Sequence, residues 1–177
     1  MKKLLLAGLA SVAVAVPVVV SALQKGEAAP MFSAKASLAA AAFDDRIKVV
    51  VSSCGLDSYL DYYNGNPKNW DPEKGWCQTR YMRKLADYKG RLADIPFDFH
   101  EMIGALAPRH TFIIAPTKDS NFRMDSVQRI IAAARPVYQL HGHGDRLKVE
   151  HPDCGHDFPP EMREAAYKLF DQVLAAK

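Results

Sequence analysis

Two short runs of apolar, mostly β-branched residues interrupt an otherwise mixed chain, at residues 47–53 and 111–116. Runs of this length without alternation predict strands that are buried on both faces, as in a parallel sheet. Residues 146–150 alternate between apolar and polar side chains instead, which predicts a strand with one exposed face near a sheet edge. The pattern therefore predicts about three strands.

Helical patterns lie before, between and after these strands. Residues 35–42 are rich in alanine, the strongest helix former. Asp125, with Gln128 three residues later, predicts the start of a second helix, which Pro136 should end or kink. Apolar residues then recur with a helical period after Pro160, a residue suited to the first position of a helix. This alternation predicts an α/β fold with parallel strands, right-handed crossovers and flanking helices.

Residues 56–109 have a different composition and predict an insertion or lid rather than a simple crossover. They mix Asn, Gly, Pro and charged residues with aromatic ones, and a helix is expected at residues 100–106. The aromatic side chains have two interpretations: they line a substrate pocket, or they pack a small core of the insertion itself. The aromatic residues concerned are Tyr59, Tyr62, Tyr63, Trp70, Trp76 and Tyr81.

The first 29 residues have the pattern of a targeting segment. Lys2 and Lys3 precede an uncharged apolar run at residues 4–23. This pattern is typical of a secretory signal peptide, and the run is also long enough to span a bilayer as an uncleaved anchor. We therefore expect a signal helix on an exported protein, periplasmic or secreted, or a protein anchored to the membrane by residues 4–23. Residues 30–42 would follow as a linker and helix.

Composition narrows the classes of function only slightly. The 177 residues suffice for one domain after the targeting segment, and the formal net charge is +3. Lys and Arg are dispersed along the chain, so nucleic acid is not an expected partner. Cys54, Cys77 and Cys154 could form one disulfide in an exported protein, or all three could be free thiols.

Asp119 and His156 are the residues best placed for chemistry. Asp119 follows the second buried run, and His156 follows the alternating strand. The carboxyl ends of successive parallel strands share one sheet edge, where α/β proteins build their ligand crevice. A carboxylate that meets an imidazole there can hold the ring in one tautomer and stabilise the imidazolium formed during catalysis.

From about residue 43 onward, the sequence resembles the C-terminal part of bacterial α/β-hydrolases, in the grouping of acetylxylan esterases, dienelactone hydrolases and prolyl oligopeptidases. The resemblance rests on three stretches, FDDRIKVVVSSCG, IPFDFHEMIGALAPRHTFIIAPTKDSNF and VEHPDCGHDFPPEMREAAYKLF. It implies a partial α/β-hydrolase fold for residues 43–177, with Asp119 as the acid and His156 as the base of a catalytic triad. It also implies hydrolysis of a carboxyl ester in a small molecule or carbohydrate, with an acetyl ester of a carbohydrate as one candidate, and no cofactor.

The serine nucleophile of such a triad is missing from the sequence. No G-x-S-x-G motif occurs, and residues 29–37, with Ser33 and Ser37, stand where the resemblance would put it. Cys54 is the substitute candidate because it follows a buried run and precedes Gly55, but it lacks the upstream glycine that the strained turn needs. We therefore expect the chain to be inactive alone, and a complementing hydrolase fragment is an expected partner.

Two other functions stay open on the sequence alone. The first is a non-catalytic exported binding module that uses the aromatic insertion. The second is a metal-binding domain built on a His-rich segment; no standard ligand spacing is met there, so no metal is expected. The candidate ligands of that segment are His141, His143, His151, Asp153, Cys154 and His156.

Overall fold

The computed structural model describes residues 34–79 and 81–175. The predicted signal peptide or anchor, residues 1–29, lies outside the described residues, and so does Ser33. Among the helices of the described residues, none combines the length and the apolar character that a membrane span requires.

Three parallel strands form the sheet, in the order β1, β2, β3. They span Val49–Ser53, His110–Ile114 and Leu147–Glu150, respectively. The predicted number and direction of the strands are confirmed. The first strand begins two residues later than predicted, and β3 shows the alternating burial expected of a half-exposed strand.

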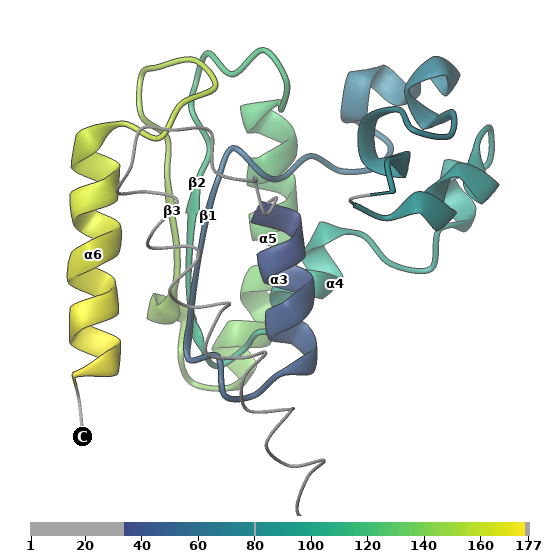
Figure 1. The fold of residues 1–177 in the computed structure, drawn as a ribbon. Helices are drawn as coiled ribbons and strands as arrows, with labels where there is room; N and C mark the ends of the chain where they lie inside the picture. The colour runs from purple at the N-terminus through teal and green to yellow at the C-terminus, as the bar shows by residue number, and fades with distance from the viewer. Residues whose placement is uncertain (1–33, 80, 176–177) are drawn as a thin grey trace, which may run out of the picture. The chain divides into compact units, whose positions relative to one another are not determined.

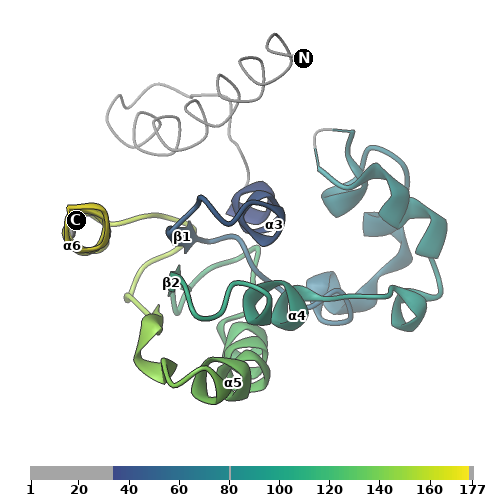
Figure 2. The same cartoon turned by 90° about the horizontal axis from the view of Figure 1, so that it is seen from below.

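Helices cover both faces of this sheet (Figure 1). The helix α6 (Pro160–Leu174) lies on one face, whereas α3 (Ala34–Phe43), α4 (Phe99–Gly104) and α5 (Met124–Leu140) lie on the other. Side chains alternate along a strand, so Val51 packs in the cluster that includes Leu169 of α6, and Val50 packs in the cluster of the opposite face. Figure 2 shows the sheet in section between α6 and the helices of the other face. The layers are therefore helix, sheet and helix, with the loops after β2 and β3 together at one sheet edge.

The helix α5 continues to Leu140, so Pro136 does not end it near Arg135, contrary to one of the two predicted outcomes. The other, a kink at Pro136, stays a prediction. Pro136 lies on the exposed side of the helix, where the carbonyl that loses its N–H partner can bind water instead. Tyr138, just beyond the proline, is fully buried, and its hydroxyl lies 2.7 Å from that of Thr111 in β2. Tertiary packing of the last turn therefore outweighs the local signal.

The insertion between β1 and α4 folds into short 3-10 turns around aromatic side chains. Trp70 is 0% exposed and packs edge-on against Tyr59 and Tyr62. Of the two interpretations, the aromatics therefore mainly form a core of the insertion itself. The turns span Tyr62–Gly65, Pro67–Trp70, Gly75–Cys77, Arg83–Tyr88 and Leu92–Asp94.

Asp98 ties the two ends of this insertion together. It caps α4 through a capping box with Glu101. This helix begins one residue before the predicted start and ends two residues before the predicted end. The same carboxylate accepts hydrogen bonds from the Ser58 hydroxyl at 2.6 Å and from the Tyr59 N–H at 3.0 Å. The insertion therefore begins and ends at nearly the same point.

Candidate functional site

The loops that follow β2 and β3 run side by side because the backbone pairing of the two strands continues beyond them. Ala115 N–H donates to the Glu150 carbonyl at 2.9 Å, Thr117 N–H to that of Pro152 at 3.0 Å, and Lys118 N–H to that of Cys154 at 3.0 Å. Side chains reinforce this pairing, since the Asp153 carboxylate accepts hydrogen bonds from the Thr117 hydroxyl and the Lys118 ammonium. The two loops therefore reach Asp119 and His156 in a fixed register.

Asp119 and His156 meet at the end of the paired loops. The Nδ1 atom of His156 lies 3.0 Å from both carboxylate oxygens of Asp119. The Asp119 side chain is 1% exposed, whereas that of His156 is 39% exposed. The Oδ1 atom of Asp119 also accepts hydrogen bonds from the backbone N–H groups of Asn121, at 2.7 Å, and Phe122, at 3.2 Å. The carboxylate is therefore buried, oriented and hydrogen-bonded, with the imidazole between it and solvent.

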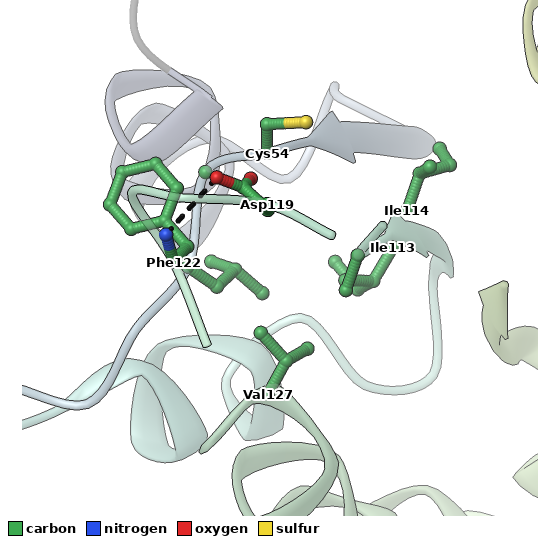
Figure 3. A pocket seen from close by; sticks show the side chains of 9 residues that line it. Cys54, Ile113, Ile114, Asp119, Phe122 and Val127 are labelled. Atoms are coloured by element: carbon green, nitrogen blue, oxygen red, sulfur yellow. Dashed lines mark hydrogen bonds between the residues drawn. The ribbon is translucent and has the colours of Figure 1, made fainter. Parts of the chain in front are cut away.

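Phe122 forms a wall of this site that the sequence analysis missed. Its ring centroid lies 5.6 Å from that of His156, and it stacks on Trp76 at 5.3 Å with an interplanar angle of 13°. Figure 3 shows Phe122 beside Asp119, joined by the hydrogen bond from its backbone N–H. The stack connects the aromatic core of the insertion to the imidazole. An aromatic residue three positions after the loop carboxylate was the available signal.

Cys54 also reaches this site, from the end of β1. Its backbone has φ of 50°, in the left-handed region that residues other than glycine seldom adopt. The thiol donates to the Asp157 carbonyl at 3.2 Å, and one ligand atom each of Cys54, Asp119 and His156 lies within 4.8 Å of the others. Burial, with a smaller contribution from Asp119, raises the pKa of the Cys54 thiol to about 12. A neutral thiol is a weak nucleophile, so the environment disfavours Cys54 in that role.

A small, mainly apolar pocket opens beside these groups (Figure 3). Asp119 and Cys54 supply its polar edge. The remaining lining residues are Gly55, Leu56, Ile113, Ile114, Ala115, Phe122 and Val127.

A family model described as "Glucuronyl esterase, fungi" matches residues 31–142, which is more than half of the chain. The chain belongs to the glucuronyl esterase family. The match includes Cys54 and Asp119, and it ends before His156. No curated protein matches the chain.

The fold of the chain is similar to part of the fold of solved glucuronoyl esterases. A carbohydrate esterase family 15 glucuronoyl esterase from Caldicellulosiruptor kristjansonii is 24% identical, with a TM-score of 0.66 over 82% of this chain and 42% of that one. The Solibacter usitatus glucuronoyl esterase is 22% identical, with a TM-score of 0.62 over 76% and 38%. The catalytic domain of the Hypocrea jecorina enzyme is 17% identical, with a TM-score of 0.61 over 81% and 42%.

These comparisons confirm the α/β-hydrolase superfamily and the partial fold. The chain spans about two fifths of the length of these solved relatives. The likeness to acetylxylan esterases, dienelactone hydrolases and prolyl oligopeptidases is not tested by them and stays a prediction.

The His-rich segment does not gather into a metal site. Within the described residues, the one set of three metal-binding side chains in mutual reach is Cys54, Asp119 and His156. The Nδ1 atom of His151 lies 2.7 Å from the Ala115 carbonyl oxygen. All three cysteines are free thiols. The open disulfide alternative is therefore not the arrangement in this structure.

Asp57 is a second buried carboxylate near the site, and sequence reasoning missed it because Asp is seldom fully buried. It is 0% exposed, and among the described residues its Oδ1 has no hydrogen-bond partner. Burial raises the pKa of Asp57 to about 6, while the Ser126 hydroxyl and the Arg123 N–H partly oppose the shift. Keeping this group ionised at neutral pH therefore costs stability.

We predict that Asp57→Asn stabilises the protein at neutral pH and has little effect in acid. Asp57 titrates near its ordinary value of 3.8 when unfolded and near 6 when folded, so the wild type loses stability as pH rises through this window. Asparagine does not ionise. The free energy of unfolding of the variant should exceed that of the wild type by about 1–2 kcal/mol at pH 7.5 and by only a few tenths of a kcal/mol at pH 4, as measured by urea denaturation.

The exposed Asp45→Asn is the matched control and should leave stability nearly unchanged at both pH values. An Asp57→Asn effect of equal size at both pH values would contradict the assignment.

Proposed function

We propose that this chain supplies the acid and the base of a serine-type esterase that acts on a carbohydrate ester. The observation that carries the proposal is the contact between the His156 ring and the Asp119 carboxylate, at the carboxyl ends of parallel strands. Membership of the glucuronyl esterase family supports an ester substrate, and an ionised acid that is buried and hydrogen-bonded suits the role of orienting a base.

The proposed chemistry divides between the two side chains. Ionised Asp119 can only accept hydrogen bonds, so it favours the tautomer of His156 that carries its proton on Nδ1. Nε2 is then free to take the proton of a nucleophile as it attacks the ester carbonyl, and the imidazolium returns that proton to the departing alcohol. Water repeats the cycle on the acyl intermediate and releases the carboxylic acid. Asp119 stays ionised and stabilises the imidazolium.

The nucleophile is proposed to come from a polypeptide segment that this sequence does not contain. The sequence has no G-x-S-x-G motif, and its solved relatives are more than twice as long as the part that it matches. Cys54 is the internal alternative, but its thiol bonds to the Asp157 carbonyl and its pKa is raised to about 12. We therefore expect the chain alone to be inactive and a complementing segment to restore turnover.

The proposed substrate is a glucuronoyl ester of a carbohydrate. The family description and the solved relatives carry this proposal. The acetyl ester implied by the sequence resemblance is the alternative. In a glucuronoyl ester the sugar acid supplies the acyl side of the ester, whereas in an acetylated sugar the sugar supplies the alcohol side. Paired assays with a glucuronate ester and an acetylated sugar therefore separate them.

The test is hydrolysis of a benzyl ester of glucuronic acid by the chain alone and by the chain co-expressed with the amino-terminal segment of a solved glucuronoyl esterase. We expect turnover only in the second case. His156→Ala and Asp119→Asn should each lower it by about a thousandfold or more, since the triad acts as a unit. The exposed His141→Ala and Asp145→Asn are matched controls and should retain activity.

Restored turnover that survives His156→Ala would overturn the proposal. Turnover by the chain alone that disappears in Cys54→Ala would identify a cysteine nucleophile instead. Carbohydrate binding without turnover in any combination would favour the non-catalytic binding module.

We also propose that residues 1–29 direct export. The positive start and the apolar run at residues 4–23 support this. After expression in a bacterial host, amino-terminal sequencing of the periplasmic or secreted protein should give a mature chain that lacks the apolar run at residues 4–23. Recovery of the full-length chain in the membrane fraction would favour the anchor, and recovery in the cytoplasm would contradict export.

A further inference from the structure

A strained turn of the insertion, residues 63–65, lies against the loop that carries Asp119. The φ angles of Tyr63, Asn64 and Gly65 are 47°, 55° and 66°, so three successive residues lie in the left-handed region. Residues with a Cβ seldom adopt this region, and they remain there only where the surroundings hold them. Strain of this kind is concentrated at ligand clamps and active sites. The turn is therefore a candidate binding element.

The turn directs two neighbouring tyrosines into different environments. Tyr62 is 8% exposed and stacks on Phe122 with ring centroids 6.0 Å apart, whereas Tyr63 is 45% exposed. The two tyrosine rings meet edge to face, with centroids 4.7 Å apart and an interplanar angle of 80°. Tyr62 therefore belongs to the aromatic stack that reaches His156, and Tyr63 extends this stack to the surface.

Hydrogen bonds fasten the turn to the loop after β2. The Tyr63 hydroxyl donates to Oδ1 of Asn121 at 3.3 Å, and the Arg123 guanidinium donates to Oδ1 of Asn64 at 3.3 Å. Asn121 is itself held by the bond from its backbone N–H to the Asp119 carboxylate at 2.7 Å. The exposed ring is therefore connected to the buried acid through a single residue.

We propose that Tyr63, Asn64 and Asn121 form a subsite for the uncharged sugar ring of the ester substrate. The inference rests on the proposed function, because that function supplies a carbohydrate ester to the adjoining pair of side chains. A sugar ring presents C–H groups on its faces and hydroxyls at its rim. An exposed aromatic face packs against the C–H groups, and amide side chains orient the hydroxyls.

The two asparagines are suited to the polar part of this role. Both side chains are exposed, and the hydrogen bonds that hold them use their amide oxygens. Each amide also carries two N–H donors, which can bind sugar hydroxyls. Tyr63 supplies the apolar contact, and the asparagines on either side of its hydroxyl bond supply the directional ones.

The charges beside the turn favour an uncharged ring over a free uronate. The guanidinium of Arg123 pairs with Asp125 at 2.7 Å, and that of Arg129 pairs with Asp61 at 2.7 Å. Both of these cations are therefore compensated, while the buried Asp119 adds negative charge nearby. The carboxylate of free glucuronate would be repelled, whereas its ester or amide would not. The subsite should therefore bind the ester and release the acid product.

The test is a magnetic resonance titration of the full isotope-labelled chain with two probes. The first is glucuronamide, an uncharged analogue of the ester, and the second is sodium glucuronate, which carries the free carboxylate. We expect glucuronamide to shift the ring resonances of Tyr63 and the side-chain amide resonances of Asn64 and Asn121. Glucuronate should bind roughly tenfold more weakly or less tightly still.

Tyr63→Ala should weaken the binding of glucuronamide by about tenfold, because it removes the aromatic face. Tyr63→Phe keeps that face and should stay within about threefold of the wild-type affinity. Tyr167→Ala is the matched control, since this tyrosine lies on α6 and should not affect binding. Circular dichroism shows whether each variant is folded.

Glucuronamide binding that is unchanged in folded Tyr63→Ala would overturn the subsite, and so would the absence of binding to the wild type. Equal affinity for glucuronate would contradict the preference for an uncharged ring. These outcomes are separate from failure of the esterase proposal, which the complemented enzyme tests by turnover. In that enzyme, Tyr63→Ala should raise KM for the benzyl ester by about tenfold and keep kcat within about twofold, the pattern of a lost binding contact.

Turnover that depends on His156 but has the same KM in Tyr63→Ala would leave the esterase proposal standing and overturn the subsite.

Discussion

The continued backbone pairing of β2 and β3 is the interaction on which the site depends. Three hydrogen bonds beyond the strands join the loop after β2 to the loop after β3, from Ala115, Thr117 and Lys118. Without them, residues 115–123 and 151–159 would form two separate surface loops, which are generally more mobile than the elements they connect. With them, Asp119 and His156 meet at one point, where the carboxylate is buried and the imidazole stays partly exposed.

The insertion contributes to the same site from a different direction. Its aromatic core reaches Phe122 through Trp76, and Phe122 in turn packs against His156. Asp98 fixes the two ends of the insertion to each other, which keeps that core close to the sheet. The imidazole therefore has an acid on one side and an aromatic wall on another, while part of the ring stays open to solvent.

Much of this arrangement could be predicted from local patterns. The apolar runs predict the strands. Because parallel strands bring the residues that follow them to one sheet edge, they also predict that Asp119 and His156 lie close together. The prediction failed where packing decides. Pro136 does not end α5 because the buried Tyr138 holds the following turn, and nothing in the local sequence reports that contact. The burial of Asp57 and the left-handed backbone of Cys54 likewise depend on tertiary neighbours.

The central claim is that ionised Asp119 holds the His156 ring with its proton on Nδ1. Proton and nitrogen magnetic resonance of the chain with ¹⁵N-labelled histidine tests it most directly. We predict a low-field Nδ1–H resonance of His156 at neutral pH that exchanges slowly with water and disappears in Asp119→Asn. A ring protonated on Nε2 alone, or an Nδ1–H signal that is unchanged in Asp119→Asn, would contradict the account.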